Sequence, residues 1–331
     1  MRKIRLFKFT IALVLVLSAC GATPQTANTP SPDNTPTSTP VSVPIQTSIP
    51  STPTPLGGVN ADTPCIGAPA PAQWHHVVVI MFENKSYDEV IGVAPYITKL
   101  AHKCGTYKNW MDADYKVDGS PDGDYDSKPN YATLTNGLSP TVHGLVDDNY
   151  DAQTKVDNIY NQLNLAGKTF KDYYDGEAGG CGVDFDGDYH DAIRYYTNVA
   201  SICNEHDVPL STFIEDLNSG NLPAFSMLLP SNNNNMHGDK LAEGDAYAST
   251  LLDPLLNSRA YAQGDVAVFF LWDEDTPIPN VLLAPSIVAG SQSEDQVSHF
   301  SALRTWEEML GLPLLGDTGK APSLLPFFGT P

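Results

Sequence analysis

Polar side chains follow four apolar runs that predict buried strands. Glu83 and Asn84 follow "VVVIMF", Asp273 and Glu274 follow "VAVFFLW", and "SNNNNMHGD" follows "AFSMLLP". After "NVLLAPSIV", a polar loop leads to His299. Carboxylate and amide oxygens are the ligands that hard divalent cations prefer. We therefore expect a divalent cation to be bound by Glu83, Asn84, Asp273 and Glu274. For Asp273-Glu274 taken alone, a solvated turn is the alternative.

Ser127 lies in a second polar segment, "DSKPNYATLTNG". Proline is favoured in the first turn of a helix, so a helix is predicted over "PNYATLTNG", with Ser127 at or near its N-terminus. The backbone amides there favour an anion such as phosphate, which makes Ser127 a candidate nucleophile. The alternative is that Ser127 only caps the helix, and the two roles are compatible.

These residues need a scaffold that brings distant segments together. The apolar runs alternate with segments that predict helices, among them "STFIEDLNSG", "DKLAEGDAYASTLLDPLLNS" and "HFSALRTWEEMLGL". In the last of these, Leu303, Trp306 and Leu310 share one face. Continuous apolar strands between helices indicate an α/β fold with a largely parallel central sheet and helices on both faces. In such sheets ligands bind at the carboxyl ends of the strands, where the polar segments fall.

The N-terminal part of the 331-residue chain differs from the rest. Residues 1–20 combine a basic start with the apolar run "FTIALVLVLSA", which is shorter than the roughly 20 residues of a membrane-spanning helix and predicts an export signal. "LSAC" resembles the bacterial lipoprotein box, which predicts lipidation at Cys20 after cleavage; an ordinary signal peptide is the alternative. Residues 21–64 are rich in Thr, Pro and Ser and predict a disordered spacer. Residues 65–331 are predicted to form one domain.

Charge and cysteine content restrict the partners and the compartment. The formal net charge of −21 opposes nucleic-acid binding and leaves the N-terminal lipid anchor as the predicted membrane contact. An exported, lipid-anchored protein of a bacterial cell envelope is expected. Four further cysteines in such a protein predict two disulfides. Three pairings are open, and we expect the neighbours in sequence to pair, Cys65 with Cys104 and Cys181 with Cys203.

Five segments in order resemble the bacterial and fungal phosphoesterase family, which contains acid phosphatases and phospholipases C and has a fold similar to alkaline phosphatase. They are "VVIMFENKSYDEVIG", "SKPNYATLTNG", "LPAFSMLLPSNNNNMHGD", "FLWDED" and "SHFSALRTWEEMLGLPLLGD". The resemblance covers nearly all of the chain from Trp74 to Phe328. It implies an alkaline-phosphatase-like fold and a small phosphate-ester substrate.

The resemblance also implies roles for individual residues. Ser127 matches the nucleophile, which also touches the metal, and the metal ligands would be Glu83, Asn84, Ser127, Asp273 and Glu274. His237 matches the histidine of "Asn-Asp-Met-His", His299 that of "Ser-His-x-Ser", and His190 that of "His-Asn-Pro". These three histidines would hold phosphoryl oxygens or protonate the leaving group, although a lone histidine is more often structural. The oxygen-rich ligand set suggests Ca, Mg or Mn, with Zn also possible.

The chain departs from the family pattern near these positions. Lys85 stands where the family has the histidine of "Glu-Asn-His-Ser", and Asn235 replaces the aspartate of "Asn-Asp-Met-His". Asp191 follows His190 where the family has asparagine. These changes leave the metal and nucleophile positions intact and bear on substrate preference. Asp239 is the candidate to replace the missing carboxylate.

The sequence therefore predicts a metal-dependent phosphoric ester hydrolase of acid phosphatase type. A metal-bound serine alkoxide would attack phosphorus and form a phosphoserine that water hydrolyses. A phospholipase C acting on phosphodiesters is the first alternative, although no additional lipid-binding domain is evident. A cell-surface binding protein that kept the fold and lost catalysis is the second, and the presence of every expected ligand argues against it.

Overall fold

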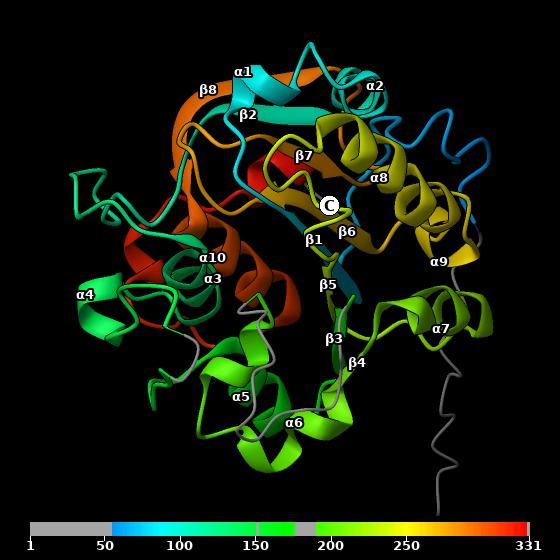
Figure 1. Ribbon diagram of the computed structural model, residues 1–331. Coiled ribbons are helices and arrows are strands. Elements are labelled where there is room, and N and C mark those ends of the chain that lie inside the picture. The colour runs from blue at the N-terminus through cyan, green and yellow to red at the C-terminus, as the bar shows by residue number, and fades with distance from the viewer. Residues whose placement is uncertain (1–54, 150–151, 176–189, 330–331) are drawn as a thin grey trace, which may run out of the picture. The chain divides into compact units, whose positions relative to one another are not determined.

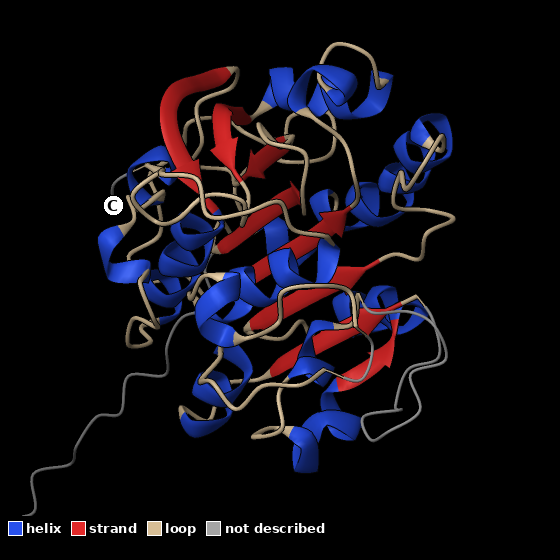
Figure 2. Ribbon diagram, turned by 60° about the vertical axis from the view of Figure 1, so that its left-hand side comes forward, coloured by secondary structure: helices blue, strands red, loops and turns tan. Residues whose placement is uncertain are grey.

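The computed structural model describes residues 55–149, 152–175 and 190–329, which contain a central eight-stranded sheet with strand order β4-β3-β5-β1-β6-β7-β2-β8 (Figures 1 and 2). All of its neighbouring pairs are parallel except β6·β7 and β2·β7. The α/β fold with a largely parallel sheet is thereby confirmed. The strands are β1 (His76–Phe82), β2 (Gly105–Met111), β3 (Phe170–Tyr174), β4 (Asp207–Pro209), β5 (Phe225–Leu229), β6 (Val266–Trp272), β7 (Asn280–Leu283) and β8 (Ser291–Ser298).

Helices cover both faces of the sheet (Figure 1). One group, on the left of the view, contains α3, α5 and α10, and the other contains α2, α7, α8 and α9. None of the helices described is both long enough and apolar enough to cross a membrane. The helices are α1 (Tyr87–Val90), α2 (Pro95–Lys103), α3 (Ser127–Asn136), α4 (Pro140–His143), α5 (Ile159–Leu165), α6 (Ala200–His206), α7 (Phe213–Ser219), α8 (Leu241–Leu256), α9 (Arg259–Ala262) and α10 (His299–Leu310).

The apolar runs predicted as strands form the centre of the sheet. β1 and β6 are paired along their full length, from His76 opposite Val266 to Phe82 opposite Trp272. The predicted face of α10 is buried against them, and Trp306 makes ring contacts with Phe225 of β5 and Phe269 of β6. These contacts fix α10, and with it the segment that begins at His299, relative to the ends of the central strands.

One expectation about the strand ends is wrong. β7 is antiparallel to both of its neighbours, so its carboxyl end lies at the opposite edge of the sheet from those of β1, β5 and β6. The polar segment predicted as a loop is instead β8. This strand brings the chain back to the side of the sheet where β1, β5 and β6 end, and it ends just before His299. Its sequence "SQSEDQVS" has no apolar run because β8 is an edge strand in which only the last two residues, Val297 and Ser298, are buried.

The N-terminal boundary of the domain also differs from the expected one. Residues 55–64, assigned to the spacer by composition, pack on the domain: the Leu56 N–H donates to the Ala262 carbonyl at 2.6 Å, and Val59 belongs to the core.

The predicted Cys65–Cys104 disulfide is confirmed, with 5.2 Å between its Cα atoms. Cys181 lies outside the described residues, so its pairing with Cys203 stays a prediction. Residues 1–54 lie outside them too, so the signal peptide, the lipidation at Cys20 and the spacer also stay predictions.

Candidate active site

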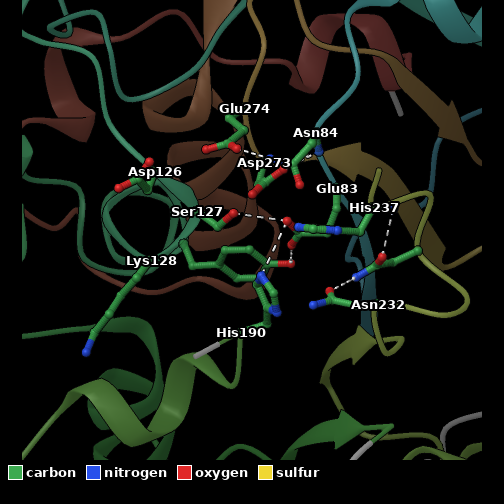
Figure 3. Close-up of polar contacts among 12 residues, drawn as sticks. Glu83, Asn84, Asp126, Ser127, Lys128, His190, Asn232, His237, Asp273 and Glu274 are labelled. Atoms are coloured by element: carbon green, nitrogen blue, oxygen red, sulfur yellow. Dashed lines mark hydrogen bonds and ion pairs between the residues drawn. The ribbon is translucent and has the colours of Figure 1, made fainter. Parts of the chain in front are cut away.

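The five residues predicted to bind a metal lie together at the carboxyl ends of β1 and β6 and the N-terminus of α3 (Figure 3). The Asn84 N–H donates to Asp273 Oδ1 at 3.1 Å, and the Asn84 side-chain amide donates to Glu274 Oε1. The Ser127 hydroxyl donates to Glu83 Oε2 at 3.0 Å. Segments almost 200 residues apart in sequence therefore meet at one group of oxygens.

The backbone around this group is held in an unusual conformation. Asn84, Met236 and Asp275 have φ values of 43°, 74° and 75°, and they are the non-glycine residues with positive φ in the described chain. Each lies in the loop that follows one of the strands β1, β5 and β6. The left-handed region costs about 1–2 kcal/mol for an L-residue, and strained backbone of this kind gathers at functional sites. All three loops thus depart from relaxed geometry where polar side chains converge.

Ser127 is the first residue of α3, as the proline-containing motif predicted, and it is buried. The helix N-terminus offers fewer free donors than expected, because the Lys128 N–H already donates to Asp148 Oδ1 at 2.8 Å and Pro129 has no N–H. The Lys128 side chain is buried and extends away from Ser127, with its ammonium group donating to the Ala152 carbonyl at 2.7 Å (Figure 3). The helix dipole remains, but other groups must provide most hydrogen bonds to a bound phosphoryl group.

Tyr131 is a site residue that the sequence analysis missed. Its hydroxyl donates to Glu83 Oε1, while Glu83 Oε2 accepts from Ser127. Tyr131 is buried and lies four residues after Ser127 in α3, so one helix face carries both contacts to Glu83. The i, i+4 spacing from the candidate nucleophile was the available signal, and it becomes informative only once Glu83 is known to face this helix.

The three predicted histidines take different positions. His190 Nε2 lies 3.4 Å from Glu83 Oε2 in a buried contact. His237 is half-buried, and its imidazole points toward Glu83 (Figure 3). His299 is fully buried, with Nε2 only 2.6 Å from the main-chain carbonyl of Asp273. This placement favours a supporting role for His299 over contact with a substrate, whereas His237 and His190 border the group formed by Glu83 and Ser127.

The carboxyl groups of the site perturb one another. Burial raises the pKa of Asp273 well above its usual value, and the nearby charges of Glu83 and Glu274 raise it further. Burial together with Glu83 also raises the pKa of Glu274, to about 9. Burial acts to raise the pKa of Glu83 as well, but the neighbouring side chains of His190, Asp273 and Tyr131 leave it below its usual value. Of the three carboxyl groups, Glu83 is therefore the one that ionises most readily.

The donor set fits a hard divalent cation. The described His, Cys, Asp and Glu side chains contain no group of three arranged to hold a metal ion as they stand. However, Asn84 Oδ1, Asp273 Oδ2 and Glu274 Oε2 are buried atoms for which the described residues provide no hydrogen-bond partner. Orphaned buried oxygens are rare in folded proteins and need an explanation. Three of them beside Glu83 and Ser127 provide the oxygen ligands that Mg²⁺, Ca²⁺ or Mn²⁺ prefers.

The departures from the family pattern have structural counterparts. Asn235 is buried, its Oδ1 accepts from the His237 N–H at 3.1 Å, and its carbonyl accepts from the Glu83 N–H at 2.9 Å. Asn235 therefore shapes the turn that carries His237. Asp239, the candidate replacement for the missing carboxylate, is exposed.

The fold is of the alkaline phosphatase type. A protein of the alkaline phosphatase superfamily from Vibrio parahaemolyticus superposes with a TM-score of 0.50 at 13% identity, covering 79% of this chain and 71% of its own. A phosphonate monoester hydrolase from Agrobacterium radiobacter gives the same TM-score and identity, with 77% and 78% covered. At these identities the likeness shows the fold alone.

Sequence comparison makes the assignment narrower. The model of the phosphoesterase family matches residues 121–313, more than half of the chain. A phosphatidylinositol-3-phosphatase from Mycobacterium tuberculosis is 29% identical over 274 residues, which cover 80% of this chain and 86% of the relative. The chain belongs to the phosphoesterase family and is a phosphoric ester hydrolase.

Proposed function

We propose that this protein is a metal-dependent phosphomonoesterase of acid phosphatase type that uses Ser127 as its nucleophile. The observation that carries the proposal is the hydrogen bond from the Ser127 hydroxyl to the buried carboxylate of Glu83, at 3.0 Å, beside three orphaned oxygens. A serine that merely capped α3 would accept from a backbone amide of its own helix. The structure gives α3 no side-chain cap, and Ser127 is its first helical residue.

The residues of the chain account for the proton and bond changes. Glu83 Oε2 lies in position to accept the proton of the Ser127 hydroxyl as Oγ forms its bond to phosphorus. The bond from phosphorus to the ester oxygen breaks, and His237 is the candidate to protonate the departing alcohol. Water then hydrolyses the phosphoserine, which releases inorganic phosphate and restores the hydroxyl. Tyr131 and His190 hold Glu83 from either side throughout.

A divalent cation fits among the oxygens of Glu83, Asn84, Ser127, Asp273 and Glu274. When bound, such a cation would stabilise the negative charge that develops on the phosphoryl oxygens and favour ionisation of the serine hydroxyl. The buried carboxyl groups are well suited to hold it, because each of them is costly to ionise beside the others without a counter-charge. Asn84 would present its orphaned Oδ1, since its side-chain nitrogen is already bonded to Glu274.

The name of the Mycobacterium relative supports a monoester, rather than a diester, as the proposed substrate of this chain. That name describes the removal of one phosphate from a phosphorylated inositol lipid, which is a monoester hydrolysis. We extend only this bond type to the present chain, so a phosphomonoester carried by a small molecule or by a lipid headgroup is the proposed substrate. The predicted lipid anchor would place the enzyme at the cell envelope with either substrate.

The test is a panel assay with p-nitrophenyl phosphate, bis-p-nitrophenyl phosphate and phosphatidylcholine, each measured across pH, with and without a chelator. We expect monoester turnover that is lost with chelator, restored by added divalent cation, and abolished in Ser127→Ala. Ser249→Ala is the matched control, because Ser249 is a partly exposed serine of α8 whose hydroxyl donates to the Ala246 carbonyl of the same helix. Turnover of the diesters alone would indicate a phospholipase, and undiminished turnover in Ser127→Ala would exclude this serine as the nucleophile.

A further inference from the structure

Lys85 connects two loops of the candidate active site. Its ammonium group donates to the carbonyl oxygen of Asn84 and to the carbonyl oxygen of Gly238, each at 2.8 Å. Asn84 lies in the turn after β1, and Gly238 lies in the loop after β5. β1 and β5 are neighbouring parallel strands, so the half-buried Lys85 side chain bridges two loops that leave the same edge of the sheet.

The loop after β1 needs support at this point. Asn84 has a φ value of 43°, in the left-handed region that non-glycine residues rarely adopt. Gly238 has a φ value of 63°, which glycine adopts without strain, so Lys85 ties the strained turn at Asn84 to a relaxed position in the second loop. Strained backbone persists when its surroundings hold it in place. A charged donor strengthens the hydrogen bonds it makes to about 1.5–3 kcal/mol each, compared with about 1 kcal/mol for neutral pairs. Lys85 is therefore a stronger link between the loops than an uncharged side chain would be.

His237 lies between this link and a second one. On its N-terminal side, the His237 N–H is bound by Asn235 Oδ1, and the Asn235 carbonyl accepts from the Glu83 N–H. On its C-terminal side, the carbonyl of the next residue, Gly238, is bound by Lys85. The backbone of His237 is thus fixed on both sides to the turn that carries Glu83, and its imidazole points toward Glu83 (Figure 3).

We propose that Lys85 is a positioning residue that holds His237 at the distance from Ser127 at which it serves the phosphoryl transfer. This inference rests on the proposed function. Two of the three ammonium hydrogens are used by the two carbonyl groups, so Lys85 acts on the reaction through the loops it joins. Lys85 occupies the position where the resembling family has a histidine. The hydrogen bond to the Gly238 carbonyl is therefore made by a lysine that the family pattern does not have.

The experiment compares Lys85→Met, Lys85→Arg, His237→Ala and the Lys85→Met/His237→Ala double variant in steady-state hydrolysis of p-nitrophenyl phosphate. Methionine keeps the length of the side chain and removes its donors. We expect kcat to fall by about 10- to 100-fold in Lys85→Met with KM changed less than about 3-fold, the scale of a misplaced catalytic group. Arginine should recover most of the loss. In the His237→Ala background, Lys85→Met should lower kcat by less than about 2-fold, since the residue it positions is gone.

A second readout is independent of turnover. Amide hydrogen exchange of residues 231–240 should be faster in Lys85→Met and close to wild type in Lys85→Arg. Lys99→Met is the matched control, because Lys99 is an exposed lysine of α2 whose ion pair with Asp62 is 3.9 Å long, and both readouts should be unchanged in it. If Lys85→Met does not fold, Lys85→Gln is measured in its place.

Several results would overturn the proposal. A raised KM with unchanged kcat would show that Lys85 binds the substrate directly. If the losses of kcat in the two single variants multiplied in the double variant, Lys85 would not act through the His237 loop. Unchanged amide exchange of residues 231–240 in Lys85→Met would show the same. If the wild-type protein hydrolysed no phosphate ester, the proposed function would fail, while the exchange measurement would still decide whether Lys85 holds the loop.

Discussion

Removing the Cys65–Cys104 disulfide should lower the free energy of unfolding by about 4 kcal/mol. The bridge closes a loop with a sequence separation of 39 residues. In the chain-entropy description, a bridge of this span removes about 13 cal/mol/K from the unfolded chain, which is about 4 kcal/mol at 25 °C. Both cysteines are buried, so alanine at either position adds a small void that costs about 1 kcal/mol.

The assay is urea unfolding of Cys65→Ala, Cys104→Ala and the double variant, followed by tryptophan fluorescence without reductant. Either single substitution abolishes the whole bridge, so the double variant should be only slightly less stable than each single variant. Turnover per folded molecule should be unchanged, because Cys104 immediately precedes β2 and lies at the edge of the sheet opposite the candidate site. Single variants that each lose less than about 1 kcal/mol, with effects that add in the double variant, would refute this reasoning.

Three further predictions concern buried polar groups. Burial raises the pKa of Glu307 to about 7 in the folded protein, compared with about 4.5 in the unfolded chain. The stability that the protonated side chain contributes is therefore fully present below pH 4.5 and is lost as the pH rises through 7. Glu307→Gln should remove about 2–3 kcal/mol of pH dependence from this window in urea titrations, and an unchanged profile would contradict the assignment. Tyr131→Phe should lower kcat about 10- to 100-fold by freeing Glu83 Oε1, whereas Tyr160→Phe, which alters a buried hydroxyl outside the site, should leave kcat unchanged; equal effects would contradict the role of the first tyrosine. Because the pKa of Glu274 is raised to about 9, Glu274→Gln should melt at a higher temperature than wild type in chelator at pH 8 while losing activity, and a lower melting temperature would argue against mutual repulsion in the site.

The sequence predicted those parts of the fold that depend on local pattern. The strands β1, β5 and β6 were predicted because burial on both faces requires a continuous apolar run, and α10 was predicted because burial on one face leaves apolar residues at the helical period. β8 was missed because an exposed edge strand needs no apolar residues. The direction of β7 was also missed, because strand direction depends on partners far away in sequence.

Some residues of the candidate site could likewise be predicted from the sequence, and others could not. Polar residues after buried strands, together with the proline-containing helix start, identified Glu83, Asn84 and Ser127 as a group that the fold brings together. The contact of Tyr131 with Glu83 and the burial of His299 behind Asp273 could not be predicted, because both depend on how α3 and α10 pack on the strands. Side-chain networks of this kind are set by tertiary packing, so a spacing such as that of Ser127 and Tyr131 becomes informative only once the packing is known.

The central claim is that Ser127 forms a covalent bond to phosphorus. The most direct test is to mix the metal-loaded enzyme with p-nitrophenyl phosphate, quench it in acid within the first turnover, and locate the phosphoryl group by peptide mass spectrometry. We expect one phosphoryl group on Ser127, in the peptide that contains "SKPNY", and none in Ser127→Ala. A phosphoryl group on another residue, or full turnover by Ser127→Ala, would contradict it.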